Sequence, residues 1–174
     1  MVDNRTYRIR KAFLLPLGLL LALCLVLLVL CLVQGQPPGK AVILGCIILP
    51  VAGLFVESLF RRTVIGADRM TVFKLLRRKS LPLAEITAVE TVMVRKRVFL
   101  TVCADEEFLI LSNAYADFPD LVETLLQRVA ENAVSEETRT MAANPPVKSS
   151  DIVSCWLAVA LLLLILYGQL GQGM

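Results

Sequence analysis

The chain has 174 residues, of which 57% are hydrophobic and 19% charged, and its mean hydropathy is +0.72. These values exclude an ordinary soluble domain, in which about half of the residues are apolar and about a quarter are charged. The net charge is only +3 and there is no histidine, which removes the commonest general base and metal ligand. We therefore expect much of the chain to face lipid.

The first predicted element is a transmembrane helix over residues 12–33. This run has no charged residue, and at about 1.5 Å per residue it can cross a hydrocarbon core of about 30 Å. Four cations precede it, namely Arg5, Arg8, Arg10 and Lys11. The run is longer than the ~7–15 apolar residues of a signal peptide, and no small-x-small cleavage pattern follows it. We interpret it as an uncleaved anchor.

A second apolar run, residues 41–60, completes a predicted transmembrane hairpin. The connector offers only Lys40, so the positive-inside rule places the basic N-terminus, residues 1–11, in the cytoplasm. Arg61 and Arg62 then mark the return of the chain to the cytoplasm. A third apolar segment, residues 152–170, predicts a third transmembrane helix. Its length is marginal, so a helix lying in the membrane interface is the alternative.

Residues 61–133 are expected to form a cytoplasmic domain that begins with short antiparallel strands. β-branched and aromatic residues alternate with turn signals, a pattern typical of such strands. The predicted strands are residues 63–65, 69–75, 79–83, 86–94, 97–103 and 107–111. The clearest hairpin has Val98, Leu100 and Val102 on one face, so we expect that face to be buried.

One amphipathic helix is predicted after the strands, with Asp117 as its N-cap and Pro119 in its first turn. It has an apolar stripe that would cover an open end or face of the sheet. The stripe consists of Leu121, Val122, Leu125, Leu126 and Val129. Residues 134–151 are polar, without a period, and are interpreted as a linker back to the membrane.

This order of elements resembles that of bacterial pleckstrin-homology-like (PH-like) domain membrane proteins. Three stretches carry the resemblance: RRTVIGADRMTVF, SLPLAEITAVE and ADFPDLVETLLQRV. Leu83 departs from the family, which often has an aromatic residue at this place. The resemblance implies an α+β membrane protein with a PH-like antiparallel barrel or split barrel, one C-terminal capping helix and an inner-membrane location. It implies a binding or scaffolding module without specifying the ligand.

The small net charge hides a strong charge polarity along the domain. Ten cations lie between Arg61 and Arg97 against three acidic residues, whereas nine acidic residues lie between Cys103 and Glu137 against one arginine. The predicted membrane-surface or partner-binding residues are Arg61, Arg62, Arg77, Arg78, Lys79, Arg95, Lys96 and Arg97. We expect them to face anionic headgroups or an acidic partner. Ordinary solvated turns are the alternative, and nucleic acid is disfavoured because neither cluster contains interleaved aromatic residues.

No constellation of residues predicts catalysis, a cofactor or a metal site. Asp105, Glu106 and Glu107 are adjacent in a predicted turn, and Cys103 has no histidine to activate it. We therefore hypothesise a non-catalytic, membrane-anchored interaction or scaffold module, a subunit of a larger inner-membrane assembly. Its expected partners are anionic lipids and a protein or a second copy of the chain. Direct recognition of one anionic lipid headgroup is the alternative.

Overall fold

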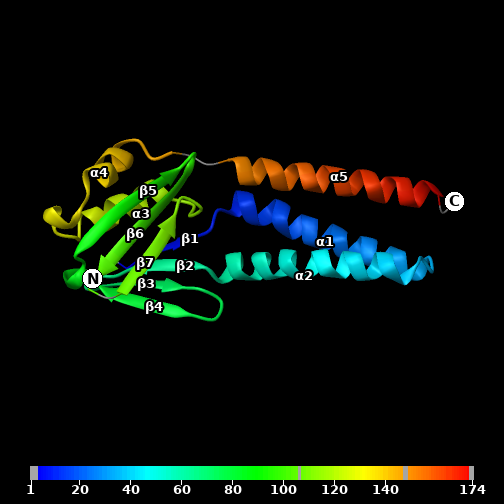
Figure 1. The fold of residues 1–174 in the computed structure, drawn as a ribbon, viewed down its shortest axis with the longest axis horizontal. Helices are drawn as coiled ribbons and strands as arrows, with labels where there is room; N and C mark the ends of the chain where they lie inside the picture. The colour runs from blue at the N-terminus through cyan, green and yellow to red at the C-terminus, as the bar shows by residue number, and fades with distance from the viewer. Residues whose placement is uncertain (1–3, 106, 147–148, 173–174) are drawn as a thin grey trace. The chain divides into compact units, whose positions relative to one another are not determined.

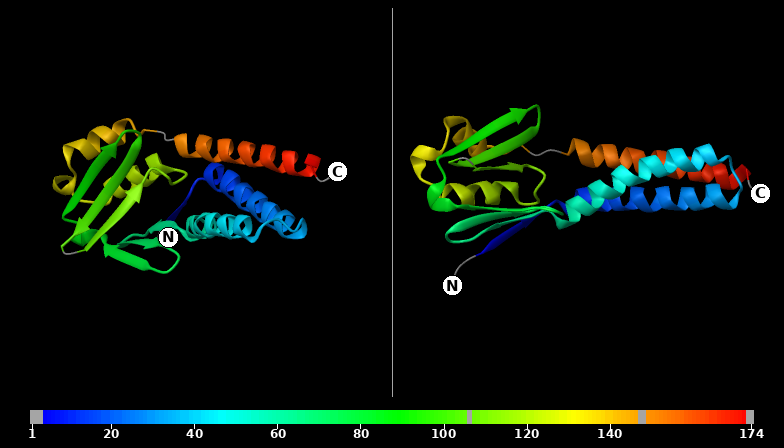
Figure 2. Two further views of the ribbon diagram at one scale, coloured as in Figure 1. Left: turned by 45° about the vertical axis from the view of Figure 1, so that its right-hand side comes forward. Right: turned by 60° about the horizontal axis from the view of Figure 1, so that its bottom comes forward.

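The computed structural model describes residues 4–105, 107–146 and 149–172. The chain forms two compact units, one of helices and one of sheets and helices, whose elements are labelled in Figure 1 and seen from two further sides in Figure 2. The N-terminal and central segments build the mixed unit, which we call the domain. The architecture is α+β with two antiparallel sheets, in agreement with the predicted class.

The helical unit contains three apolar helices of 23 residues each. They are α1 (Lys11–Val33), α2 (Pro38–Phe60) and α5 (Ser150–Gln172). At about 1.5 Å per residue each is about 35 Å long, and all three are long and apolar enough to cross a membrane. The three predicted apolar helices are therefore confirmed, including the third.

Within this unit α5 runs in the same direction as α1. Gln169, near the end of α5, accepts a hydrogen bond of 3.1 Å from Nε2 of Gln36, which lies in the connection between α1 and α2. Gly18 of α1 permits a close approach of α2, because a Cβ atom at this position would lie 2.9 Å from the ring of Phe55. A larger residue at Gly18 would require the Phe55 ring to shift.

The first sheet of the domain has the strand order β1–β2–β3–β4. Its strands are β1 (Arg5–Arg8), β2 (Arg62–Ile65), β3 (Arg69–Phe73) and β4 (Arg78–Pro82). Strands β2 to β4 lie where the sequence predicted strands. Strand β1 was not predicted, because we used the N-terminal cations only to orient the chain. Pairing with β2 sets its register, with Tyr7 opposite Thr63.

The second sheet has the order β5–β6–β7 and also agrees with the predicted strands. It consists of β5 (Ala88–Val94), β6 (Arg97–Ala104) and β7 (Glu107–Ser112). The predicted core face of β6 is confirmed, since Val98, Leu100 and Val102 are fully buried. The resemblance implied a barrel or split barrel, and the two sheets do not close into a barrel. Strand β4 ends at Pro82, which has no N–H for a further ladder bond, and a short 3₁₀ turn, η1 (Leu83–Glu85), precedes β5.

Helix α3 (Phe118–Leu126) contributes the predicted apolar stripe except for Val129, which lies beyond the end of the helix and is buried. Leu121, Val122 and Leu125 are buried, whereas Leu126 is half-buried. Pro119 lies in the first turn as expected. Asp117 is at the N-cap position, but its side chain makes no capping hydrogen bond.

The expected linker contains ordered elements that belong to the domain. They are η2 (Glu131–Ala133) and α4 (Glu136–Ala143). Thr138 donates from Oγ1 to the carbonyl of Val89 at 3.1 Å, and Met141 is buried. The compact unit therefore includes η2 and α4, beyond the boundary at residue 133. The sequence did not indicate α4 because its eight residues bury only two side chains, too few to show an apolar period.

Candidate functional site at the basic end of the domain

Tyr115, which follows β7, holds together the two chain segments that lead to α1 and α2. Arg10, directly before α1, donates from Nε to the carbonyl of Tyr115 at 3.1 Å. Arg61, directly after α2, lies over the Tyr115 ring, 5.9 Å from its centre. The Tyr115 hydroxyl accepts a hydrogen bond of 2.8 Å from Thr63 Oγ1, and the whole side chain is buried. This residue therefore fixes both segments at one place.

Asn113 joins the segment that leads to α5 to the same place. Its Nδ2 donates to the carbonyl of Pro146 at 3.0 Å, in the segment before α5, and to the carbonyl of Lys96 at 2.9 Å, in the β5–β6 turn. Its Oδ1 accepts from the backbone N–H of Val98 at 3.4 Å. All three segments that continue into the apolar helices therefore leave the domain at one end. We call this the connection end.

Three arginines lie in one cross-strand row at the connection end of the first sheet. Arg8 is opposite Arg62, Arg62 is opposite Phe73, and Phe73 is opposite Arg78; residues directly opposite one another share a face. Arg62 and Arg78 lie over the Phe73 ring at 4.5 and 5.1 Å from its centre. An aromatic face positions a guanidinium group without neutralising it. None of the three arginines forms a salt bridge within the described part of the chain, so the row keeps its positive charge.

The β3–β4 turn, Lys74–Arg77, extends beyond the arginine row. A backbone hydrogen bond from Lys74 N to the Arg77 carbonyl, 2.8 Å long, closes it. The two middle residues are Leu75 and Leu76, and Leu76 is 91% exposed. The turn therefore presents two leucines between two cations.

The β5–β6 turn combines the same kinds of residue. Arg95 and Lys96 connect the strands, and the three residues before them, Val92, Met93 and Val94, are each about half exposed. Arg95 has a φ angle of 57°, in the left-handed region that costs a non-glycine residue about 1–2 kcal/mol. A cation thus occupies a position where glycine would be less strained.

The structure brings most of the predicted basic residues to the connection end. They are Arg62, Arg77, Arg78, Arg95, Lys96 and Arg97. Arg61 is also there but is half-buried against Tyr115, with its Nε atom shielded from solvent and without a hydrogen-bond partner.

Lys79 is the predicted basic residue whose side chain contacts β7 instead of joining the other cations. Its Nζ donates to the carbonyl of Phe108 at 2.9 Å and lies 3.9 Å from the carboxylate of Glu107. It also lies 5.1 Å from the centre of the Phe108 ring. Lys79 therefore joins β4 to β7 within the domain.

Sequence reasoning missed Arg8 and Arg10 as part of this site, because we used the N-terminal cations only to orient the chain. The signal that could have found them is the alternation around them. Tyr7 and Ile9 are both buried, as expected for a short strand with one face on the core.

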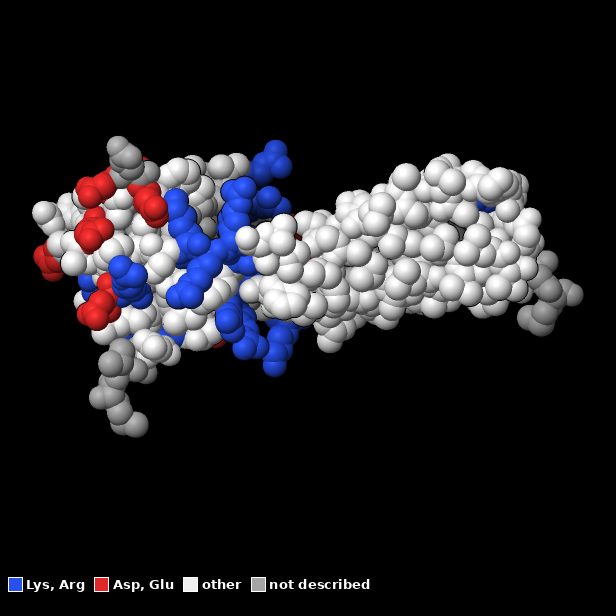
Figure 3. Space-filling model, turned by 90° about the horizontal axis from the view of Figure 1, so that it is seen from below, with Lys and Arg blue, Asp and Glu red and all other residues white. Residues whose placement is uncertain are grey.

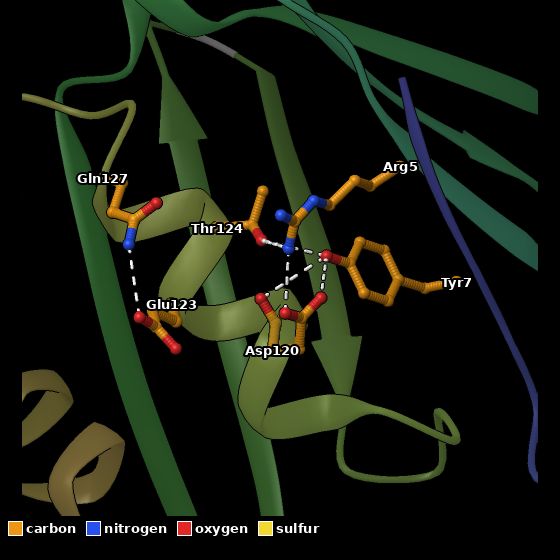
Figure 4. A network of polar contacts seen from close by, with 6 residues as sticks. All are labelled: Arg5, Tyr7, Asp120, Glu123, Thr124 and Gln127. Carbon is orange, nitrogen blue, oxygen red and sulfur yellow. Dashed lines mark hydrogen bonds and ion pairs between the residues drawn. The ribbon is translucent and has the colours of Figure 1, made fainter. Parts of the chain in front are cut away.

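A polar network fastens β1 to α3 (Figure 4). Arg5 donates from Nη1 to Asp120 Oδ1 at 2.9 Å, and the Tyr7 hydroxyl donates to Asp120 Oδ2 at 2.6 Å. The Tyr7 hydroxyl also lies 3.0 Å from Thr124 Oγ1. The hydrogen bond from Tyr7, assisted by Arg5, lowers the pKa of Asp120, while burial and the bond to Asp120 raise the pKa of Tyr7. Strand β1 is therefore held by α3 as well as by β2.

Acidic turns lie at the opposite end of the domain. Asp68 is in the β2–β3 turn, Glu85 is in η1, and Asp105 follows β6. The first two turns are joined by a hydrogen bond of 2.8 Å from Leu83 N to the Asp68 carbonyl. The predicted acidic turn also includes Glu106, which lies outside the described residues. On the face shown in Figure 3, most lysines and arginines gather over the connection end and the acidic residues toward the other end.

No protein-family model, curated protein or solved structure matches the chain at a significant level. Among the described residues, no three Cys, Asp or Glu side chains come together as metal ligands would. What the connection end offers is a set of guanidinium and ammonium donors, which suit phosphate and carboxylate groups.

Proposed function

We propose that the three apolar helices anchor a PH-like interaction module in the bacterial inner membrane, and that its connection end adheres to anionic headgroups of the cytoplasmic leaflet. One observation carries this proposal. The arginine row and both basic turns lie at the end where the chain continues into all three apolar helices. A helix that crosses the membrane ends at the headgroups, and each residue beyond it spans at most about 3.6 Å. The connection end would therefore lie within reach of lipid phosphates.

The order of the strands supports the PH-like part of the proposal. A four-stranded and a three-stranded antiparallel sheet are followed by α3, whose apolar side is buried. This is the order of elements that the family resemblance implied. The cations before α1 and after α2 support a cytoplasmic domain, because positive residues next to membrane helices favour that side.

Adhesion by many weak contacts suits a tethered domain. Each cation near an anionic surface contributes about 1 kcal/mol, screened beyond a Debye length. Tethering keeps the domain at a high effective concentration near lipid, so contacts that are weak alone become sufficient. Adhesion at the connection end would leave the acidic opposite end, with Asp68, Glu85 and Asp105, free for a protein partner. This use of the domain is that of a scaffold rather than an enzyme.

The test uses the full chain in vesicles, with its own trypsin sites as the readout. Exposed lysines and arginines in the turns are cut when the domain is free, and adhesion protects them. We expect cleavage after Arg77 and Arg95 to slow as the fraction of phosphatidylglycerol rises, and to recover at high salt. Cleavage after Arg139, exposed in α4, is the internal control and should not respond.

Recognition of one headgroup is the second candidate function, favoured by the two guanidinium groups held over Phe73. Vesicles with different anionic lipids at equal total charge separate the two functions. Equal protection supports adhesion by charge, whereas protection by one lipid alone supports recognition. Absence of protection in every lipid contradicts both. A membrane partner that is lost when Arg77, Arg78, Arg95 and Lys96 are changed to Ser would assign the basic end to a protein.

A further inference from the structure

We propose that the two turns of the connection end are insertion tips: their apolar residues enter the bilayer interface, below the cations beside them. The first tip is formed by Leu75 and Leu76, and the second by Val92, Met93 and Val94. This inference rests on the proposed function, because it takes the connection end to face the membrane. It adds apolar insertion to adhesion by charge.

The exposure of Leu76 is not required by the turn in which it lies. At 91%, it is the most exposed large apolar residue in the described part of the chain. Tight turns are served best by Gly, Asn, Asp, Pro or Ser, and this turn contains none of them. At the opposite end, by contrast, the β2–β3 turn contains Gly66 and Asp68. Two leucines at a hairpin tip therefore indicate an apolar environment for that tip.

The second tip is apolar on both faces of the hairpin. Met93 is opposite Val98 and shares its face, whereas Val92 and Val94 point to the other face. A strand of an antiparallel sheet with one wet face alternates apolar and polar residues. That alternation stops at residue 92, and residues 92–94 are all about half exposed. A hairpin end that is apolar on both faces suits an apolar medium, such as the bilayer interface, that contacts both faces.

The cations beside the tips are placed to stay at the lipid phosphates while the apolar residues lie deeper. Lys74 and Arg77 flank the first tip, and Arg95 and Lys96 follow the second. Their aliphatic stems can follow the tips inward while the charged groups stay at the phosphates. The first turn extends about two residues, or about 7 Å, beyond the row that contains Arg62. Interfacial protein segments are buried about 5–10 Å into the boundary between headgroups and acyl chains.

Tryptophan quenching by lipid tests the insertion in the full chain. The sequence contains one tryptophan, Trp156, which is first changed to Phe. One new tryptophan is then introduced as Leu76→Trp or Met93→Trp. The matched control is Ala84→Trp, an exposed position in η1 at the opposite end of the domain. Each variant is reconstituted in phosphatidylglycerol-containing vesicles with lipids brominated either near the glycerol or near the chain terminus.

We expect both tip variants to show blue-shifted emission and quenching by brominated lipid, stronger for bromine near the glycerol. The control should show neither and should instead be quenched by acrylamide in the water. If both tip variants behave like the control while trypsin protection still depends on anionic lipid, insertion is wrong and adhesion stands. If that protection is absent as well, both proposals fail.

A protein that covers the tips would give a different result. The tip tryptophans would then be shielded from acrylamide in native membranes, yet brominated lipid would not quench them in vesicles of pure lipid. This outcome also overturns insertion, and it assigns the tips to a protein interface.

Discussion

The two ends of the domain both connect strands by short segments but carry opposite surfaces. At the connection end, the turns Lys74–Arg77 and Arg95–Lys96 combine cations with exposed apolar neighbours. At the opposite end, Asp68, Glu85 and Asp105 occupy the turns. Hydrogen bonds of comparable length hold the turns at each of the two ends. The fold therefore does not require the difference, which points instead to what each end faces.

Gly66 illustrates how the acidic end meets its own structural needs with small residues. A Cβ atom at Gly66 would lie 3.0 Å from Asn4 Oδ1 and 3.3 Å from the Arg69 carbonyl. Arg128 donates to the Gly66 carbonyl from α3's C-terminal side. The turn is thus held by close backbone packing, with no exposed large apolar residue among its members. The β2–β3 turn therefore exposes small and acidic residues, whereas the β3–β4 turn exposes Leu76.

Among substitutions at the two ends, Tyr115→Ala is expected to destabilise the domain most. Loss of a buried aromatic side chain costs about 3–5 kcal/mol, and here it also releases the segments that lead to α1 and α2. Hydrogen exchange of the detergent-solubilised chain should accelerate most in β1 and β2. Tyr115→Phe is the control; it keeps the ring and loses only the bond with Thr63, about 1 kcal/mol. A Tyr115→Phe variant as unstable as Tyr115→Ala would contradict the central role of the ring.

Asn113→Ala should have the next largest effect, about 1–3 kcal/mol, because it leaves buried polar groups without partners. The carbonyls of Lys96 and Pro146 both lose a donor. We expect faster hydrogen exchange in the β5–β6 turn than in the acidic turns. Asn132→Ala, at an exposed position in η2, is the matched control. Equal acceleration at both ends would show that Asn113 does not act locally.

Arg95→Gly separates the structural requirement of the second tip from its charge. Glycine adopts the positive φ angle without strain, so the variant should gain about 1 kcal/mol in unfolding free energy. It also loses a cation, so the protection of Arg77 from trypsin in anionic vesicles should weaken. Urea unfolding and the protection assay should therefore move in opposite directions. A drop in both would mean that the Arg95 side chain serves the fold.

The smallest expected effect is the pH dependence of stability that comes from the contacts between β1 and α3. The pKa of Asp120 lies below the ordinary value of 3.8, so its stabilising contribution is present above pH about 4 and is lost as the pH falls further. The pKa of Tyr7 lies above 10.0, so its contribution is present below pH 10 and is lost at higher pH. The Arg5–Asp120 pair is about half exposed, which limits the effect to below about 1 kcal/mol.

Urea unfolding between pH 3 and pH 7 measures this effect by comparison with Asp120→Asn. The variant should be less stable near pH 7 and should converge with the unaltered chain at the acidic limit. A constant difference across this range would exclude the carboxylate as the titrating group.

Local sequence patterns were enough to predict the elements that are long or strongly periodic. The apolar helices, strands β2 to β7 and the stripe on α3 all follow from the composition of continuous segments. Strand β1 and helix α4 were not predicted, since each depends on distant partners, β2 for the strand and β5 for the helix. The basic clusters were also predictable, because cations that are adjacent in the sequence remain adjacent in the fold.

The composition of the chain decided that apolar helices carry a charged domain, because burial of apolar residues and solvation of charges act on each segment separately. Only the tertiary structure decided which charges lie together. Register placed Arg8 beside Arg62, and Asn113 and Tyr115 gathered three segments that are far apart in the sequence. Lys79 was turned toward Phe108 by the same long-range packing. Such contacts depend on the relative positions of strands, which no single stretch of sequence encodes.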